Sequence, residues 1–196
     1  MIQKNFILAT AGHIDHGKST LIEALSGINP DRLPEEQKRG MTIDLGFAHL
    51  NIQDKENTVF SLGLIDVPGH ADFVKNMVAG AGAVDLAMFV VAADDGWMPQ
   101  SEEHLQILSY LNVKRAVVAL TKSDTVEDID FSIEVIKDSL KGSLYENSPI
   151  VPVCALIGDG IDELKKVIIK ELKELHPPSN IDKPDRKSTR LNSSHQ

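Results

Sequence analysis

The chain has 196 residues, of which 42% are hydrophobic, a single cysteine and a formal net charge of −9. This length is enough for one globular domain, and the single cysteine excludes an internal disulfide and is typical of a cytoplasmic protein. The negative charge argues against a domain that grips nucleic acid by electrostatic attraction alone. No apolar stretch reaches the roughly 18 residues of a membrane span, so we expect no membrane partner.

A glycine-bounded loop follows the first predicted strand, residues 5–10. Residues 12–19 read Gly-His-Ile-Asp-His-Gly-Lys-Ser and lead into a helix expected over residues 18–26. The loop matches the phosphate-binding pattern G-x-x-x-x-G-K-[ST] in the required strand–loop–helix order, which argues against a chance match in a βα turn. Lys18 would place its charge over the β- and γ-phosphates, and Ser19 its hydroxyl on Mg²⁺. The residues expected to contact the nucleotide here are His13, Ile14, Asp15, His16, Gly17, Lys18, Ser19 and Thr20.

Two later segments carry further candidate contacts to Mg²⁺ and phosphate. Residues 29–40 are charged and contain two prolines, which predicts a solvated, mobile loop. Thr42, at its end, is placed to give Mg²⁺ a second hydroxyl. Asp66 ends a later strand, where its carboxylate could hold Mg²⁺ through water, and Gly69 could offer its N–H to the γ-phosphate. Taken singly, Thr42 is a strand-entry residue and Asp66 a turn aspartate.

The rest of the chain alternates strands with helices. Residues 54–57 form the turn of a hairpin whose second strand begins at residue 58, which makes one strand antiparallel. We expect helices near residues 71–79, 99–110, 127–140 and 161–175, and buried strands near residues 85–93, 115–120 and 149–154. This order predicts an α/β fold, a P-loop NTPase three-layer sandwich with a mainly parallel six-stranded sheet and one antiparallel strand.

Two short sequences after the later strands are suited to a guanine base. Residues 121–124 read Thr-Lys-Ser-Asp. The carboxylate of Asp124 can accept hydrogen bonds from both N1–H and N2–H₂ of guanine, a donor pair that adenine lacks, while the stem of Lys122 lies over the base. After the last strand, a backbone N–H could reach guanine O6 from the segment Cys154, Ala155 and Leu156. Each of these two segments is weak evidence alone. Together with the loop at residues 12–19, Thr42 and Asp66, they make five segments whose order indicates a domain that binds GTP and GDP.

Together these sequences resemble the G domain of translational GTPases, and specifically the selenocysteine-specific elongation factor family. The resemblance covers residues 4–184. Its general signs are residues 12–19, residues 66–70, and the Met-Pro-Gln at residues 98–100 followed by Glu-His-Leu at residues 103–105. The sign nearest to that family is the run Asp-Arg-Leu-Pro-Glu-Glu-Gln-Lys-Arg-Gly-Met-Thr-Ile-Asp-Leu-Gly-Phe at residues 31–47. The resemblance implies a GTPase that the ribosome stimulates, and we expect a monomer. It also implies delivery of selenocysteyl-tRNA and recognition of an mRNA hairpin through domains outside this chain.

The resemblance also assigns roles to single residues. His70 would orient the attacking water, and Ile14 and Met41 would form an apolar gate that restrains His70. Read without the resemblance, His70 is a surface histidine at a helix start. Asp15 is a candidate contact for a monovalent cation. The residues implied in catalysis are Lys18, Thr42, Gly69 and His70.

Two positions depart from the family pattern. Thr121 stands where the family has an asparagine that braces the phosphate loop, and Cys154 stands where it has a serine. The backbone contact from Ala155 survives the second change, and guanine specificity rests on Asp124. We expect loop or surface positions rather than metal ligation for His13, His16, His49 and His104.

The predicted domain organisation is a GTP-binding domain over residues 1–176 and the start of a linker over residues 177–184. Residues 185–196 resemble a translated sequencing adapter and are expected to be disordered, although their composition also suits a natural polar tail. The alternatives for function are an elongation factor Tu-like or initiation factor two gamma-like GTPase, against which residues 31–47 argue, and a free-standing GTP-dependent binding switch. An ATP-dependent P-loop protein is disfavoured by Asp124.

Overall fold

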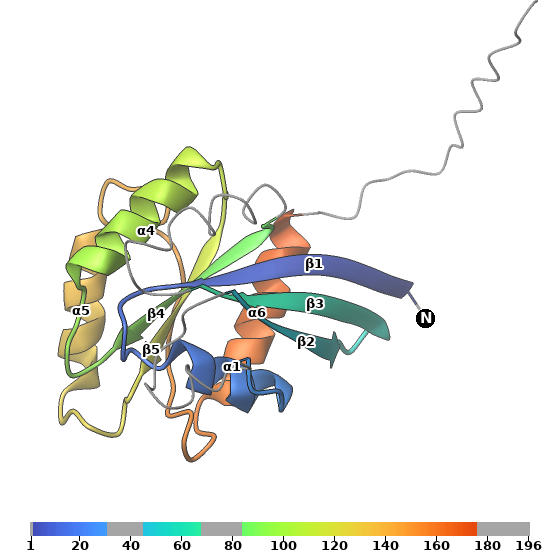
Figure 1. The fold of residues 1–196 in the computed structure, drawn as a ribbon, viewed down its shortest axis with the longest axis horizontal. Coiled ribbons are helices and arrows are strands. Elements are labelled where there is room, and N and C mark those ends of the chain that lie inside the picture. The colour runs from blue at the N-terminus through green and yellow to red at the C-terminus, as the bar shows by residue number, and fades with distance from the viewer. Residues whose placement is uncertain (1, 31–44, 68–83, 176–196) are drawn as a thin grey trace, which may run out of the picture.

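The computed structural model describes residues 2–30, 45–67 and 84–175 as a twisted sheet with helices on both faces (Figure 1). Its strands are β1 (Ile2–Ala11), β2 (Gly46–Gln53), β3 (Thr58–Asp66), β4 (Leu86–Ala92), β5 (Ala116–Thr121) and β6 (Ile150–Pro152). Its helices are α1 (Lys18–Ser26), α4 (Pro99–Tyr110), α5 (Ile129–Leu140) and α6 (Ile161–Leu175). The predicted three-layer α/β architecture is therefore confirmed.

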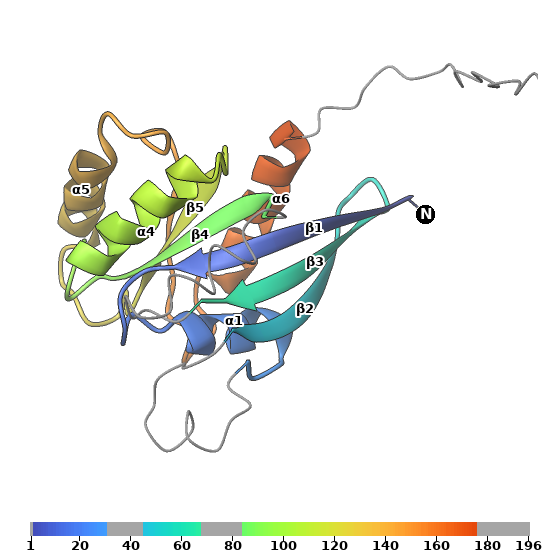
Figure 2. The same ribbon diagram turned by 45° about the horizontal axis from the view of Figure 1, so that its top comes forward.

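The six strands pair in the order β2-β3-β1-β4-β5-β6. Every neighbouring pair is parallel except β2 and β3, which form the predicted antiparallel hairpin. Parallel strands end at the same edge of a sheet, so the loops that follow β1, β3, β4, β5 and β6 gather there. Figure 2 shows the arrows of β1 and β3 ending on the side where α1 begins.

Apolar side chains fill both sides of the sheet. One cluster packs α1 and α6 against it, and a second packs α4 and α5 against the opposite face. Strands β4 and β5 are buried along their whole length because helices cover both of their faces, as their continuous apolar sequences predict. The layers thus hold the carboxyl ends of the central strands in fixed positions.

Local chemistry sets the ends of the helices. Helix α1 stops at Gly27, which adopts the left-handed φ of 73° and donates its N–H to Glu23 (2.8 Å), as predicted. Helix α5 begins at Ile129 rather than near residue 127, because the carboxylate of Asp128 caps it by accepting the N–H of Phe131 (3.0 Å).

Strand ends follow pairing rather than hydropathy. Strand β1 begins at Ile2, three residues before the predicted start, because residues 2–4 pair with residues 58–60 of β3. Strand β6 is shorter than predicted, at Ile150–Pro152, since only three of its residues pair with β5.

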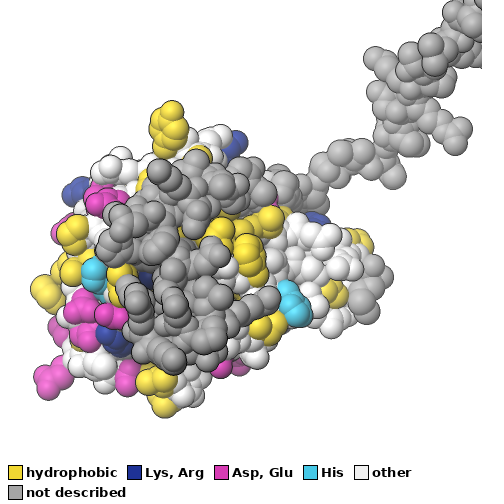
Figure 3. All heavy atoms as spheres, viewed as in Figure 1, with side chains coloured by type: hydrophobic (Ala, Val, Ile, Leu, Met, Phe, Trp, Pro, Cys, Tyr) yellow, Lys and Arg dark blue, Asp and Glu magenta, His cyan; other side chains and the backbone are white. Residues whose placement is uncertain are grey.

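Several predictions lie outside the described residues. They concern the predicted helix at 71–79, the linker, the tail, and the residues Met41, Thr42, Gly69 and His70. None of the helices within the described ranges combines the length and the apolar content that crossing a membrane requires. On the face shown in Figure 3, the described Lys and Arg side chains are scattered rather than gathered in one patch.

Candidate functional site

The glycine-bounded loop joins β1 to α1 at the edge where the parallel strands end. Gly12 has a φ of 138°, and a Cβ at this position would collide with the carbonyl oxygen of Val90 in β4. Gly17 caps α1 with a left-handed φ of 81°, and Asp15 is also left-handed at 64°. The two glycines therefore allow the loop to lie against β4 and to turn into the helix.

The side chain of Lys18 folds back from the start of α1 to the first residues of the loop. Its side chain is buried, and its ammonium donates to the carbonyl oxygens of Gly12 (3.2 Å) and His13 (2.6 Å). The positive charge therefore lies among the carbonyls of the loop's first half, at the start of α1. This arrangement can hold an anion, because a helix start and a lysine both favour negative charge.

Helix α4 holds the other side of the loop. The N–H of Gly12 donates to Nδ1 of His104 (2.9 Å), and the N–H of Ile14 donates to Oε1 of Gln100 (3.2 Å). Gln100 and His104 are four residues apart and share one helix face. Burial, together with the nearby charge of Lys18, lowers the pKa of His104 to about 4, so Nδ1 remains an acceptor at neutral pH.

The prediction of a loop or surface position is therefore wrong for His104, which is helical and only 2% exposed. His16 does lie in the loop, but it is fully buried. Its Nδ1 lies 3.3 Å from the carbonyl oxygen of Val90, and since a carbonyl only accepts, this nitrogen carries the hydrogen. Burial lowers the pKa of His16 to about 4, although Val90 and the Asp95 carboxylate favour the charged form.

Thr121 joins the loop to the end of β5. Its hydroxyl donates to the carbonyl oxygen of His16 at 2.7 Å, and the carbonyl of Val91 lies at 3.3 Å. A hydroxyl has one hydrogen, so the shorter contact to His16 takes it. Thr121 thus bonds to the phosphate loop directly, as the resemblance implies for the asparagine that it replaces.

Asp66, at the end of β3, is fully buried beside the loop. Its Oδ1 accepts a hydrogen bond from Thr10 (2.8 Å), and its Oδ2 accepts one from Ser19 (2.7 Å). Carboxylate and hydroxyl oxygens are the donors that Mg²⁺ prefers, so these residues fit the ion. Among the described residues, no group of three or more His, Cys, Asp or Glu side chains could hold a metal by itself.

A pocket of about 280 Å³ opens next to the loop. It brings together the loop and the two segments that the sequence assigns to a base, and it is lined by Asp15, Gly17, Thr20, Thr121, Lys122, Asp124, Thr125, Cys154, Ala155 and Leu156.

Hydrogen bonds order the pocket walls. Thr125 donates its hydroxyl to the carbonyl of Lys122 (2.7 Å), which adopts a left-handed φ of 53°. The Lys122 ammonium lies 3.5 Å from the carboxylate of Asp94, which is in the turn after β4. The N–H of Ser123 donates to Val153 (3.3 Å), which links the two base segments. These contacts place Lys122 next to Asp94 and Ser123 next to Val153, the residue before Cys154.

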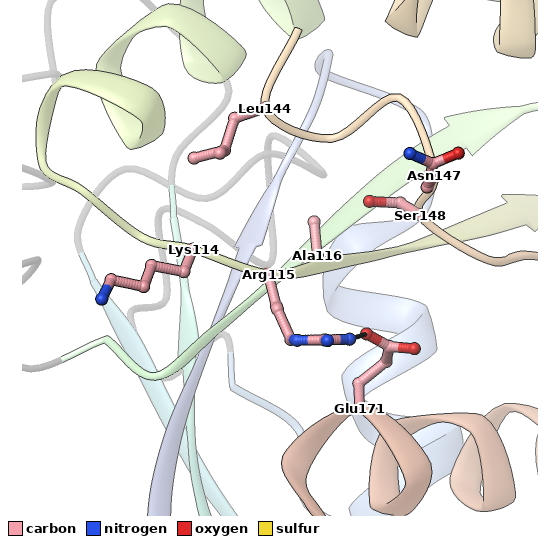
Figure 4. Close-up of a pocket in the computed structure, with 7 residues that line it drawn as sticks. All are labelled: Lys114, Arg115, Ala116, Leu144, Asn147, Ser148 and Glu171. Atoms are coloured by element: carbon pink, nitrogen blue, oxygen red, sulfur yellow. Dashed lines mark hydrogen bonds and ion pairs between the residues drawn. The ribbon is translucent and has the colours of Figure 1, made fainter. Parts of the chain in front are cut away.

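A second hollow, of about 200 Å³, lies at the start of β5, away from this edge (Figure 4). There the guanidinium of Arg115 points at the carboxylate of Glu171 on α6, 2.7 Å away, and it also pairs with Glu174. The two carboxylates raise the pKa of Arg115, chiefly through the bond to Glu171. This hollow thus contains an ion pair that ties β5 to α6.

Sequence reasoning missed three residues that support the site: Thr10, Gln100 and His104. Thr10 is a single polar residue in an apolar strand, and its position directly before the loop was the one available signal. Gln100 and His104 carried a signal only as part of the family resemblance. The predicted contacts Thr42, Gly69 and His70 lie outside the described residues.

The sequence model of the elongation factor Tu GTP binding domain matches residues 3–174. The chain is 54% identical to a selenocysteine-specific elongation factor of Desulfomicrobium baculatum over 164 residues, which are 83% of this chain and 25% of that protein. It therefore spans about a quarter of that relative's length.

Solved structures agree with this match. The crystal structure of a bacterial selenocysteine-specific elongation factor has a TM-score of 0.78 and 43% identity over 87% of this chain and 29% of that one. Elongation factor SelB of Methanococcus maripaludis, in complex with the GTP analogue GppNHp, has a TM-score of 0.74 and 38% identity over 88% of this chain and 35% of that one. The chain therefore belongs to the family of the elongation factor Tu GTP-binding domain, and within it resembles the domain of selenocysteine-specific elongation factors.

Proposed function

We propose that the chain binds GTP and GDP and hydrolyses GTP as the G domain of a selenocysteine-specific elongation factor. The observation that carries this proposal is the bond from Thr121 to His16, which joins a pocket containing Asp124 to a loop containing Lys18. The residues assigned to the base and those assigned to the phosphates are thereby joined by a hydrogen bond. GTPase activity as such follows from membership of the family.

Guanine recognition is assigned to the pocket residues. Asp124 accepts the two N–H groups of guanine, the Lys122 stem covers the base, and the segment from Cys154 to Leu156 supplies an N–H to O6. Both Lys122 and Asp124 line the pocket, which supports these roles. Adenine offers no matching pair of donors, so the assignment predicts GTP rather than ATP as the ligand.

The phosphates are assigned to residues 13–20, with Lys18 as the main positive charge and Asp15 as a candidate contact for a monovalent cation. Mg²⁺ would be held by Ser19, Asp66 and Thr42, and when bound it would neutralise charge on the phosphate oxygens. The close contact of Ser19 with Asp66 supports this set. Gly69 would bind the γ-phosphate, and His70 would orient the attacking water behind a gate formed by Ile14 and Met41.

The complete protein would deliver selenocysteyl-tRNA to the ribosome and read an mRNA hairpin through other domains. The similarity to proteins named selenocysteine-specific elongation factors supports this role. We expect a cytoplasmic monomer in which residues 1–176 are the GTP-binding domain and residues 177–184 begin a linker.

Long-read sequencing across the codon for Pro184 tests the organisation first. A reading frame that continues into further domains supports the elongation factor and identifies residues 185–196 as adapter. A natural stop codon after Gln196 would instead favour a free-standing switch.

Single-turnover GTP hydrolysis then tests the function on the complete protein, with and without ribosomes. We expect slow hydrolysis alone and strong acceleration by ribosomes programmed with a selenocysteine codon. A rate that ribosomes leave unchanged would contradict the elongation-factor mechanism. Equal acceleration without the mRNA hairpin would point to a factor of the elongation factor Tu or initiation factor two gamma type.

A further inference from the structure

We propose that Thr10 is a positioning residue of the metal site, and that its hydroxyl fixes which oxygen of Asp66 faces Ser19. The inference rests on the proposed function, because it concerns the Mg²⁺ site assigned there. Thr10 is not among the residues that line the pocket. It would act on the metal through Asp66.

The hydroxyl of Thr10 is bonded on both sides. It donates to Oδ1 of Asp66 at 2.8 Å and accepts the N–H of Val67 at 3.1 Å. The carbonyl of Ile65 lies at 3.5 Å, but a hydroxyl has one hydrogen, and the shorter bond to a charged acceptor takes it. Thr10 and Asp66 are both fully buried, so water does not compete for these bonds.

The backbone explains why a side chain is needed at this point. The regular pairing of β1 with β3 ends at Ala9 opposite Ile65. Beyond it, the N–H of Val67 bonds to the Thr10 hydroxyl instead of to a backbone carbonyl of β1. Thr10 therefore continues the contact between the two strands past the last paired residues, and the same oxygen orients the carboxylate.

The consequence for the metal site is geometric. Because Thr10 occupies Oδ1, the other oxygen of Asp66 is the one that faces the loop, 2.7 Å from Oγ of Ser19. Mg²⁺ prefers octahedral coordination by oxygens, and Asp66 would hold it through water while Ser19 would hold it directly, so Oδ2 of Asp66 and Oγ of Ser19 have to face the same ion site. Mg²⁺ tolerates little departure from this geometry, so a carboxylate free to rotate would bind it less well.

The test measures Mg²⁺ dependence rather than activity. A fluorescent GDP analogue is bound to the full chain in EDTA and then across a Mg²⁺ titration, for the wild type, Thr10→Val and Thr10→Ser. Thr10→Val keeps the shape but removes the hydroxyl, and we expect it to raise the Mg²⁺ midpoint roughly 10- to 100-fold, as loss of a ligand's supporting bond commonly does. Affinity for the analogue in EDTA should change less than about threefold, and Thr10→Ser should restore the midpoint.

Two further variants keep the result interpretable. Thr58→Val makes the same chemical change at the start of β3, distant from the loop, and should leave the midpoint unchanged. If Thr10→Val does not fold, as judged by circular dichroism, Thr10→Cys is compared with Thr10→Ser instead. A thiol is a weak donor, so the midpoint should rise for cysteine and not for serine.

Either of two results would overturn the inference alone: an unchanged midpoint in Thr10→Val, or an equal loss of affinity with and without Mg²⁺, which is the mark of a merely structural role. If the GDP affinity of the wild type does not depend on the Mg²⁺ concentration, the proposed metal site is overturned, and this inference with it. The wild-type titration distinguishes the two failures.

Discussion

Acidification should destabilise the folded chain through its two buried histidines near the phosphate loop. The pKa of His16 and that of His104 fall from 6.5 to about 4 on folding. The unfolded chain therefore binds protons more readily, and the stability due to each neutral ring is complete above pH 6.5 and is lost as the pH falls toward 4. Between about pH 7.5 and about pH 5, this linkage costs about 2 kcal/mol per histidine.

His104→Asn isolates one of these contributions. Asparagine cannot titrate, and its Oδ1 can take the place of Nδ1 as the acceptor for the N–H of Gly12. The free energy of unfolding is measured in urea without nucleotide at both pH values for the wild type and the variant. We expect the variant to lose about 2 kcal/mol less than the wild type on acidification. Parallel losses would refute the assignment of a neutral, buried His104.

Two further changes test how the loop is held. Thr121→Val removes the donor to the buried carbonyl of His16 and should lower the free energy of unfolding by about 1–2 kcal/mol and weaken GDP binding. Thr121→Ser should restore both. Equal stability of the wild type and Thr121→Val in urea would contradict this. Gly12→Ala should cost more than about 2 kcal/mol because its methyl group meets Val90, whereas Gly17→Ala meets open space and should cost about 1 kcal/mol. Thermal unfolding without nucleotide compares the last two, and similar losses would argue against the close contact with β4.

These contacts describe a loop that is held from several directions. Two N–H groups of the loop donate to side chains of helix α4, the Lys18 ammonium donates to two loop carbonyls, and the Thr121 hydroxyl donates to a third. A loop fixed in this way loses little conformational entropy when an anion binds. The same contacts make the loop sensitive to displacement of α4 or of the end of β5.

The sequence predicted the elements whose signals are local. The bounds of α1, α4 and α6 match their predictions, since a C-cap glycine, a proline in the first turn and an apolar stripe are readable along the chain. Strand ends were less accurate, because the start of β1 depends on its partner β3 rather than on its own hydropathy. The antiparallel hairpin was predictable from its turn at residues 54–57.

The site residues also divide into those with a local sequence signal and those whose role depends on distant contacts. Phosphate-loop and base-pocket residues lie in short segments with fixed spacing, so the sequence could propose them. Asp15, Gly17 and Thr20 of the loop line one pocket with residues of the two base segments. Thr10 and His104 could not be assigned, because their roles depend on contacts with residues far away in the sequence. Thr10 bonds to Asp66 on the neighbouring strand, and His104 accepts the N–H of Gly12 in the loop. A buried histidine in a helix has no sequence signature that separates it from an exposed one.

The central claim is that Asp124 selects guanine nucleotides. Calorimetric titration of the full chain with GDP, XDP and ADP, for the wild type and Asp124→Asn, tests it most directly. The wild type should bind GDP at least about 100-fold more tightly than XDP or ADP, since two bonds to a charged acceptor are worth roughly 1.5–3 kcal/mol each. Asp124→Asn should prefer XDP, because its amide N–H₂ can donate to the extra carbonyl of xanthine. Equal binding of GDP and ADP by the wild type, or an unchanged GDP preference in the variant, would contradict the account.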